Sequence, residues 1–529
     1  MNARPLSHAS VPPPAPAGPG ILLWPLGATT GLLALGWLPR VQQSPMVAWA
    51  VWGAAVCLLA WQVLLALRFR NGGLPGLVWT TPRAQHYIQA CCQFTIYLYW
   101  GQFWPPVYQY FPLLLAQMLF AYAFGMLLSW TRRQPYALGL GPVPIILSTN
   151  LFMWFKDEYY PLQFVLIAVG VLGKAFVQWE RDGRRVHIFN PSAFTLALFS
   201  LILIATGQTS MTWAQEIATT IGLGPHTYKV MFAVGLVAMY NFATTPVSAT
   251  AAATLFTGSG LVMAIAGVPY FVDSDIPAAV FLGLHLLVTD PSTSPRTTVG
   301  RVLFGMGYGV SVFALYAILA ALGAPTFYDK LLCVPILNLL VPAIDRLVTR
   351  MGDRPLFDRL GFSGALGRAN LPHMAAWVLF FGAMTLRGVT DGMHTGDALP
   401  FWQQACEAGK PKACDRLLNI EANYCRDNAG WACNELGRHF TEGRLVSADA
   451  DRAFGYFSRA CEARYQPGCL NMLGDAEADV VATDPRPFDL RLLLREGGPN
   501  LLEMSEPDLY ARACRHGWSE ACPKAAVSR

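Results

Sequence analysis

Long apolar stretches separated by short polar segments dominate the first 390 residues of the chain. A helix needs about 20 apolar residues to cross a bilayer, and most of these stretches approach that length. Several contain glycine or proline, which membrane helices tolerate when neighbouring helices satisfy the backbone. The pattern predicts an all-α transmembrane bundle of about thirteen helices. The predicted spans are Ile21–Leu38, Met46–Leu67, Tyr87–Trp104, Phe111–Trp130, Leu138–Phe155, Pro161–Trp179, Ser192–Gly207, Val230–Thr244, Thr250–Val268, Ile276–Val288, Val302–Leu322, Leu331–Ile344 and Leu371–Leu386.

The same pattern divides the chain into four parts. Residues 1–20 are rich in proline and alanine and hold one arginine, so we interpret them as a disordered leader and not as a cleaved signal peptide. Residues 21–386 form the predicted transmembrane domain. Residues 387–400, with their glycines and terminal proline, form a linker. Residues 401–529 are more polar and rich in cysteine, and we expect them to form a separate helical domain.

Composition and charge support a membrane protein. Of the 529 residues, 54% are hydrophobic and only 13% are charged. Soluble domains carry about 25% charged residues. The net charge of +5 is modest, and no basic run is interleaved with aromatic residues, so nucleic acid is not an expected partner. The chain also lacks a phosphate loop and a dinucleotide glycine fingerprint.

The loop charges predict the orientation of the chain. With the N-terminus in the cytoplasm, the inside loops hold sixteen Lys and Arg residues and the outside loops hold four. The inside set is Arg4, Arg68, Arg70, Arg83, Arg132, Arg133, Arg181, Arg184, Arg185, Arg296, Arg301, Arg346, Arg350, Arg354, Arg359 and Arg368. The outside set is Arg40, Lys156, Lys229 and Lys330. The positive-inside rule therefore predicts a multi-pass protein with an extracytoplasmic C-terminal domain. We expect its membrane to be the bacterial inner membrane.

Eight of the twelve cysteines lie after residue 400, in four pairs with seven intervening residues each. The pairs are Cys406–Cys414, Cys425–Cys433, Cys461–Cys469 and Cys514–Cys522. Zinc ligands are usually spaced by about two to four residues and often include histidine. We therefore predict four disulfides, which need an oxidising compartment, in agreement with the charge pattern. No metal site is predicted, and the adjacent Cys91 and Cys92 are interpreted as small apolar fillers.

The cysteine-rich domain resembles the Sel-like repeats, which are relatives of the tetratricopeptide repeat. The residues that carry the resemblance are Leu436-Gly437, Leu473-Gly474, Ala453, Tyr456 and Phe457. The 36 residues from Cys425 to Cys461 match the expected period, and an insertion around 484–499 interrupts it. The resemblance implies a surface that binds an extracytoplasmic protein partner. A passive cap on the membrane domain is the alternative.

Two polar stretches interrupt the apolar pattern. In RRVHIFNPSAF, Asn190 and Pro191 have the residue types that begin a helix. In HLLVTDPSTSPRTTVGR, an apolar helix runs into a hydroxyl-rich loop over residues 289–301, before a new helix begins. Such a loop offers hydroxyl groups, Arg296 and a helix N-terminus to a phosphate or to a polar ring edge. His285, inside the preceding helix, is interpreted as a hydrogen-bonded core histidine.

The order of these stretches is similar to one family of membrane proteins: the D subunit of Rnf electron-transport complexes and the B subunit of the sodium-pumping NADH:quinone oxidoreductase. The matching motifs are an FNPA-type helix start, a TDPVT-type loop followed by GR, and a final helix with Asn, Pro and Asp. In this chain they are Phe189, Asn190, Pro191, Thr289, Asp290, Pro291, Gly300, Arg301, Asn338, Pro342 and Asp345. The resemblance covers about residues 85–350 and excludes the cysteine-rich domain.

The resemblance implies a bundle of two pseudo-repeated halves that binds FMN or riboflavin. The residues expected to bind it are Asn190, Thr289, Asp290, Ser292, Arg296 and Arg301. In the family a threonine within an S-x-A-T motif carries covalent FMN. Here Thr219 is the nearest remnant in the expected loop, and Thr250, within VSAT, is the alternative. Covalent attachment, non-covalent binding and loss of the flavin all remain open.

The resulting functional expectation is a membrane subunit of a flavin-dependent electron-transport complex, with ion translocation as a further role. The expected partners are membrane lipid, the other subunits of the complex and an extracytoplasmic protein. Electrons from a nicotinamide would have to enter through another subunit. Two alternatives stay open: a flavin-free transporter of ions or solutes, suggested by the proline-broken helix ends near residues 190 and 290, and a membrane-anchored scaffold that acts through its helical repeats.

Overall fold

The computed structural model describes residues 19–69, 76–79, 84–181, 183–272, 274–351, 370–390, 394–426 and 428–473. These residues are mostly helical and form two compact units. Among the described residues, the first unit draws on positions within 1–221, 227–254 and 278–380, and the second on positions within 222–226, 255–277 and 381–529. The predicted pair Cys514–Cys522, the insertion around 484–499, Gly474 and most of the leader lie outside the described residues, as do Arg70, Arg83, Arg354, Arg359 and Arg368.

Each of the thirteen predicted spans contains a helix. They are α1 (Leu23–Leu35), α3 (Pro45–Arg68), α4 (Ala84–Phe103), α5 (Pro106–Thr131), α6 (Pro142–Asn150), α7 (Pro161–Phe176), α8 (Pro191–Ala205), α10 (Thr227–Phe242), α11 (Thr245–Ala266), α12 (Ala278–Leu286), α13 (Thr298–Ala321), α14 (Asp329–Met351) and α16 (Leu371–Leu386). Several begin with proline in the first turn, where its missing N–H would have no helical partner. Short elements connect them: η1 (Pro19–Leu22), α2 (Pro39–Gln42), η2 (Asp157–Tyr159), η3 (Thr209–Met211), α9 (Ala214–Thr220) and η4 (Thr326–Tyr328).

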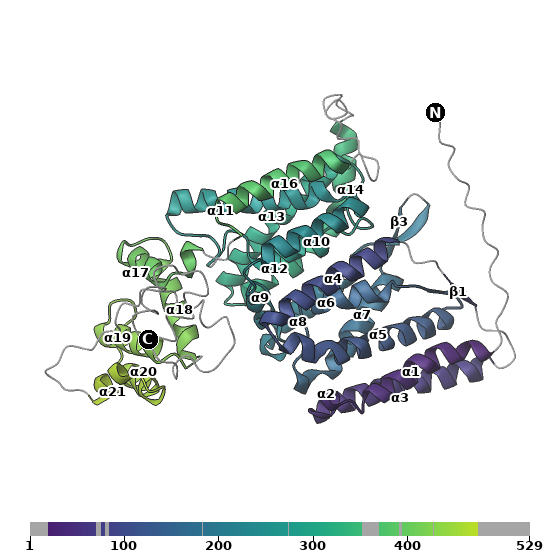
Figure 1. The fold of residues 1–529 in the computed structure, drawn as a ribbon, viewed down its shortest axis with the longest axis horizontal. Coiled ribbons are helices and arrows are strands. Elements are labelled where there is room, and N and C mark those ends of the chain that lie inside the picture. Colours follow the sequence, from purple (N-terminus) through teal and green to yellow (C-terminus); the bar gives the residue numbers. More distant parts are fainter. Residues whose placement is uncertain are drawn as a thin grey trace, which may run out of the picture. The chain divides into compact units, whose positions relative to one another are not determined.

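Within the described residues, five helices are long and apolar enough to cross a membrane: α3, α5, α11, α13, and α14 extended to 326–350. The surface of α3 has the character expected in lipid, because Trp49, Val56 and Val63 are each more than half exposed and recur every seven residues along one face. Helix α3 also packs beside α1 (Figure 1). The chain therefore contains apolar helices that could span a membrane, although the thirteen spans are not confirmed.

Two of the predicted spans are wrong in length. Helices α6 and α12 have nine residues each, or about 14 Å at 1.5 Å per residue, which is about half of the hydrocarbon core. Helix α6 ends at Asn150, whose amide group hydrogen-bonds to Gln117 of α5 (2.7 Å) and accepts a hydrogen bond from Gln163 of α7 (3.2 Å). All three amides are fully buried. The network supplies polar partners where the helix stops, which an apolar environment could not do.

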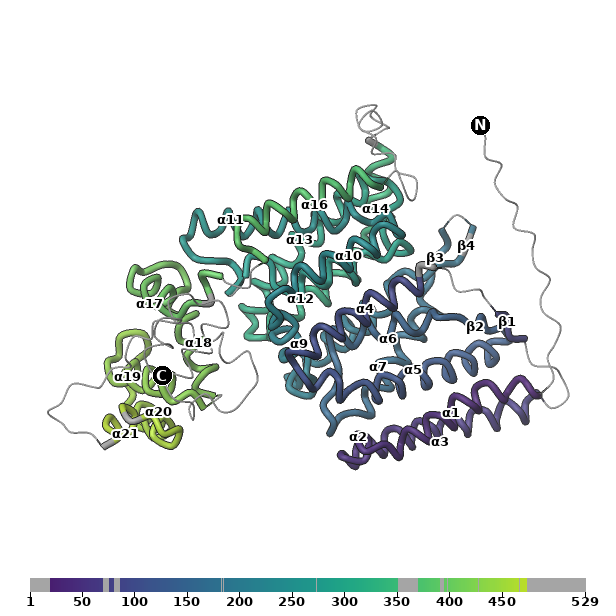
Figure 2. The backbone as a smooth tube through the Cα atoms, in the orientation of Figure 1, coloured from purple at the N-terminus to yellow at the C-terminus, as the bar shows by residue number. Residues whose placement is uncertain are grey.

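Two small sheets depart from the all-α expectation (Figure 2). Strand β1 (Leu77–Trp79) pairs in parallel with β2 (Tyr136–Leu138), with Leu77 opposite Tyr136. Strand β3 (Gln178–Arg181) pairs in antiparallel register with β4 (Arg184–His187), with Gln178 opposite His187. Because α7 ends at Phe176, the predicted span to Trp179 was too long. The alternating sequence QWER-DG-RRVH carries the Asp-Gly hairpin signal, which the hydropathy pattern hid.

Contacts in the first unit link loops that the charge pattern placed on the same side. Arg40 and Asp157, both predicted outside, form an ion pair at 2.8 Å. Arg181 and Asp345, both predicted inside, form another at 2.9 Å. These pairs agree with the predicted alternation of the helices, whereas the side that faces the cytoplasm stays a prediction.

The helices after residue 398 belong to the second unit. They are α17 (Leu399–Glu407), α18 (Ala413–Arg426), α19 (Gly430–Glu442), α20 (Ala450–Glu462) and α21 (Gln466–Leu473), preceded by η6 (Thr395–Asp397). Disulfides Cys406–Cys414, Cys425–Cys433 and Cys461–Cys469 each join the end of one helix to the start of the next, as the spacing predicted. At Gly437 a Cβ would lie 2.5 Å from the Phe457 ring, so glycine allows α19 and α20 to pack closely.

Candidate functional site

Three segments that lie far apart in the sequence meet through asparagine side chains. The amide of Asn338 on α14 accepts a hydrogen bond from the backbone N–H of Asn190 at 3.2 Å and donates one to the carbonyl oxygen of Thr293, also at 3.2 Å. Asn190 in turn donates from Nδ2 to the carbonyl oxygen of Leu287, just after α12. The start of α8, the loop after α12 and the middle of α14 are thereby held together.

Asn190 is the N-cap of α8, as its sequence context predicted. Its Oδ1 accepts hydrogen bonds from the backbone N–H groups of Ser192 (3.0 Å) and Ala193 (3.2 Å). Pro191 occupies the first helical position. The side chain therefore uses its oxygen to begin the helix and its nitrogen to bind the next segment.

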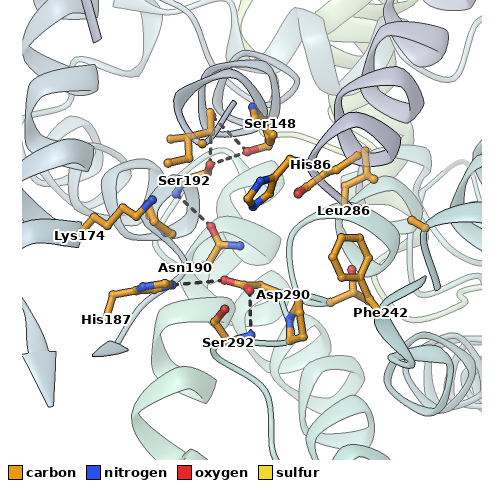
Figure 3. Close-up of a pocket in the computed structure, with 18 of the residues that line it drawn as sticks. His86, Ser148, Lys174, His187, Asn190, Ser192, Phe242, Leu286, Asp290 and Ser292 are labelled. Carbon is orange, nitrogen blue, oxygen red and sulfur yellow. Dashed lines mark hydrogen bonds and ion pairs between the residues drawn. The ribbon is translucent and has the colours of Figure 1, made fainter. Parts of the chain in front are cut away.

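A cavity of about 240 Å³ lies beside this junction, and we name it the polar pocket (Figure 3). Most of its side chains come from the starts of α4, α6 and α8, the end of α7, strand β4, and the end of α12 with its following loop. The lining residues are His86, Gln89, Gly141, Pro144, Ile145, Ser148, Lys174, His187, Asn190, Pro191, Ser192, Ala238, Phe242, His285, Leu286, Thr289, Asp290, Pro291 and Ser292. The short helices α6 and α12 matter here because their ends bring backbone and polar groups to the pocket.

Asp290 is the negative charge of the polar pocket. Its carboxylate pairs with His187 at 3.7 Å and accepts a hydrogen bond from the backbone N–H of Ser292 at 2.9 Å, both visible in Figure 3. Burial alone would raise the pKa of Asp290, but the interactions with His187 and Ser292 outweigh it, so the pKa lies below its usual value. The amino group of Lys174 completes a pocket that combines one carboxylate with several nitrogen groups.

His285 lines the polar pocket, and one of its ring nitrogens has no hydrogen-bond partner among the described residues. The side chain is 2% exposed, and its Nδ1 donates to the carbonyl oxygen of Phe281 at 2.7 Å. A carbonyl only accepts, so the neutral ring carries its proton on Nδ1 and leaves a lone pair on Nε2. Among the described residues Nε2 has no hydrogen-bond partner. The interpretation of His285 as a fully hydrogen-bonded core residue thus holds for one ring nitrogen only.

Gly235 makes room for this histidine. A Cβ at position 235 would lie 2.0 Å from Cδ2 of the His285 ring. Glycine on α10 therefore lets the imidazole lie against the helix backbone.

A second cavity, of about 420 Å³, shares Pro291 and Ser292 with the polar pocket, and we name it the arginine cavity. Its other lining residues are Arg181, Val186, Ser294, Pro295, Arg296 and Arg301. Arg301 donates to the carbonyl oxygens of Pro295 (3.1 Å) and Ala243 (2.8 Å). Arg181 pairs with Asp345, and burial lowers the pKa of Arg181, an effect that Asp345 opposes and Arg296 adds to.

The structure therefore divides the predicted flavin-binding residues between two cavities. Asn190, Thr289 and Asp290 line the polar pocket, Arg296 and Arg301 line the arginine cavity, and Ser292 lines both. Thr219 lies on α9, exposed, with its hydroxyl bonded within its own helix. Thr250 lies on α11, where its hydroxyl donates to the carbonyl oxygens of Pro246 and Val302. Neither threonine lines either cavity.

Sequence reasoning missed His86, Lys174, His187 and Arg181 as pocket residues. Lys174 had a usable signal, since a lone charge in an apolar helix is costly and marks functional positions. Arg181 and His187 belong to the unrecognised hairpin. The described residues hold no group of three or more His, Cys, Asp or Glu side chains that could bind a metal ion.

The chain matches no protein-family model, no curated protein and no solved structure. Its class follows from the structure alone: a largely helical chain with apolar helices that could span a membrane and a cysteine-bridged helical region.

Proposed function

We propose that this chain is a membrane subunit of a flavin-dependent electron-transport complex and binds FMN or riboflavin without a covalent bond in the polar pocket. The observation that carries the proposal is the junction of Asn190, Thr293 and Asn338. Three motifs that resemble those of the Rnf D and sodium-pumping oxidoreductase B subunits, about 50 to 150 residues apart in the sequence, hydrogen-bond to one another beside a polar cavity. Motifs that served only to cap separate helices would not need to hydrogen-bond to one another.

The groups of the polar pocket suit the polar edge of a flavin ring. Such an edge carries carbonyl and ring-nitrogen acceptors and one N–H donor, and each needs a partner away from water. Ser292 and Lys174 can donate, and Asp290 can accept. A bound flavin would supply reversible electron transfer. The protein groups would orient its ring and hold protons close to it.

The same proposal includes the topology of the chain and its partners. The bundle has about thirteen spans in a bacterial inner membrane, with the N-terminus in the cytoplasm and the cysteine-rich domain outside. Other subunits deliver and remove electrons, and the helical repeats bind an extracytoplasmic protein. Ion translocation would be coupled to the electron flow.

A flavin-free transporter is the second candidate, and the lengths of α6 and α12 favour it. Half-length helices with one terminus at a polar cavity are also how transporters build binding sites inside the membrane. In that case the polar pocket would hold an ion or solute, and the protein would carry no chromophore.

The visible absorption spectrum of the purified protein separates the two candidates. A flavin band that is lost in Asp290→Ala and kept in Asn241→Ala supports the first candidate. Asn241 is the control because it donates to the carbonyl oxygen of Val237 in its own helix and does not line the pocket. A flavin that leaves on acid precipitation is non-covalent. A colourless protein that stays colourless after incubation with FMN and riboflavin would reject the flavin proposal.

A further inference from the structure

The loop between α11 and α12 packs with the cysteine-rich helices. Residues 267–277 form this loop, and they belong to the same compact unit as α17 to α21. Val268 lies in one buried hydrophobic cluster with Trp402 and Cys406 of α17. The cysteine-rich helices are therefore bound to a loop of the same chain that lies more than a hundred residues earlier in the sequence.

The contacts of this loop go to the turn that the first disulfide closes, which we name the first disulfide turn (residues 406–414). Gly267 has a positive φ of 69°, and a Cβ at this position would lie 3.3 Å from Cε of Lys410, inside the turn. Arg416, just after the turn, donates to the carbonyl oxygen of Tyr270 at 3.4 Å. The position of the loop therefore depends on the shape of the turn.

The disulfide holds the first disulfide turn in a conformation that the chain would not keep by itself. Gly409 and Lys412 both have a positive φ, of 64° and 57°. Glycine adopts this conformation readily, whereas lysine keeps it only where the surrounding structure enforces it. Without the Cys406–Cys414 bond, Lys412 can return to an ordinary φ. Lys410, two residues earlier, would then move away from Gly267.

The same disulfide is open to attack by a thiol. Thiol–disulfide exchange requires the attacking thiolate to reach one of the two sulfur atoms. Cys414 is partly buried, whereas Cys425 and Cys433 of the second disulfide are 1% and 0% exposed. A reductant can therefore reach the first disulfide while the second stays closed.

We infer that Cys406–Cys414 is a redox-active disulfide, that a dithiol reductant opens it, and that its opening releases the loop over residues 267–277. A thiolate of the dithiol attacks Sγ of Cys414, the S–S bond breaks, and Cys406 leaves as a thiolate that takes up a proton. The second thiol of the reductant then attacks the mixed disulfide. Two electrons and two protons pass to the protein, and the dithiol becomes a disulfide. This inference does not rest on the proposed flavin.

The test uses the full-length protein in nanodiscs, with dithiothreitol as the dithiol at graded concentrations. Alkylation and mass spectrometry identify which disulfides have opened, and amide hydrogen exchange measures the release of residues 267–277. The variants are Cys406→Ser/Cys414→Ser and the control Cys461→Ser/Cys469→Ser. The control disulfide has the same spacing and two partly buried cysteines, and none of the loop contacts described above involves it.

In the wild type, dithiothreitol should open Cys406–Cys414 at a lower concentration than Cys425–Cys433. The amides of residues 267–277 should then exchange at least about tenfold faster. In Cys406→Ser/Cys414→Ser the loop should exchange fast without reductant, and the same concentration of dithiothreitol should add nothing. In Cys461→Ser/Cys469→Ser the loop should behave as in the wild type.

Three outcomes would overturn the inference. The first is an unchanged exchange rate of the loop after Cys406–Cys414 has opened. The second is opening of this disulfide only together with Cys425–Cys433, which would mark it as purely structural. The third is equally fast loop exchange in Cys461→Ser/Cys469→Ser, which would indicate a general loss of stability. If Cys406→Ser/Cys414→Ser does not fold, the titration of the wild type and of the control decides.

Discussion

Replacing Asn190 by alanine should destabilise the first unit more than a normal cap deletion does. The side chain makes three described hydrogen bonds: it accepts from the N–H groups of Ser192 and Ala193 and donates to the carbonyl oxygen of Leu287. Alanine removes all three at a position that is 8% exposed. The N-terminal N–H groups of α8 and a carbonyl after α12 would then lack these partners.

The expected loss of stability follows from the two roles of the Asn190 side chain, as the cap of α8 and as the donor to Leu287. Loss of an N-cap acceptor costs about 0.5–2 kcal/mol. A buried carbonyl left without its partner costs about 1–3 kcal/mol. We therefore expect Asn190→Ala to lower the free energy of unfolding by about 2–4 kcal/mol. Asn190→Ser should lose about half as much, because a serine hydroxyl can cap α8 but is too short to reach Leu287.

The assay is equilibrium unfolding of the purified protein in mixed micelles, with a denaturing detergent as the variable. Ser44→Ala is the matched control: Ser44 is the N-cap residue of α3, but its side chain makes no cap hydrogen bond. Its replacement should change the free energy by less than about 0.5 kcal/mol. If Asn190→Ala shifts the unfolding midpoint no more than Ser44→Ala does, the junction does not hold the segments together and the reasoning fails.

Three further predictions concern other parts of the chain. Replacing Cys425 and Cys433 together by serine should lower the free energy of unfolding of the cysteine-rich region by about 2–3 kcal/mol. The loss should be seen as faster proteolysis within residues 428–473 of the full-length protein, and an unchanged rate of cleavage would contradict this prediction. An impermeant thiol reagent added to intact cells should label Ser447→Cys, but not Arg184→Cys, above the wild-type background, and the reverse pattern would invert the topology. The pKa of Asp290 in the folded protein lies below its unfolded value of about 3.9, so the stability that its carboxylate contributes is complete well above that value and is lost as the pH falls from about 5 through the folded pKa. Asp290→Asn should therefore make the free energy of unfolding fall less steeply at acid pH. An unchanged slope would show that Asp290 does not stabilise the fold in this way.

Features set by neighbouring residues were predictable from the sequence. A long run of apolar residues favours a helix, and each predicted span contains one. The cysteine spacing brings two sulfurs together across a single helix turn and loop, so the pairing of Cys406 with Cys414 needed no tertiary knowledge. The cap at Asn190 is equally local, because its oxygen meets N–H groups two and three residues ahead. The Asp-Gly signal of the β3–β4 hairpin was local too. It was overlooked because the apolar run of α7 continues through Val177 to Trp179, which extended the predicted span into the first strand.

The site itself depended on the packing of helices. Hydropathy could not show that α6 and α12 stop after nine residues, because the side-chain amides that hydrogen-bond at their C-terminal ends, those of Gln117 and Asn190, come from other segments of the chain. Nor could the sequence show that Arg181 lies beside Arg301, or that Thr219 lies away from both cavities. The distance between residues over a hundred positions apart depends on every helix between them. The sequence by itself therefore determined where helices form and the three described disulfides, whereas only the tertiary structure decided which charges share a cavity.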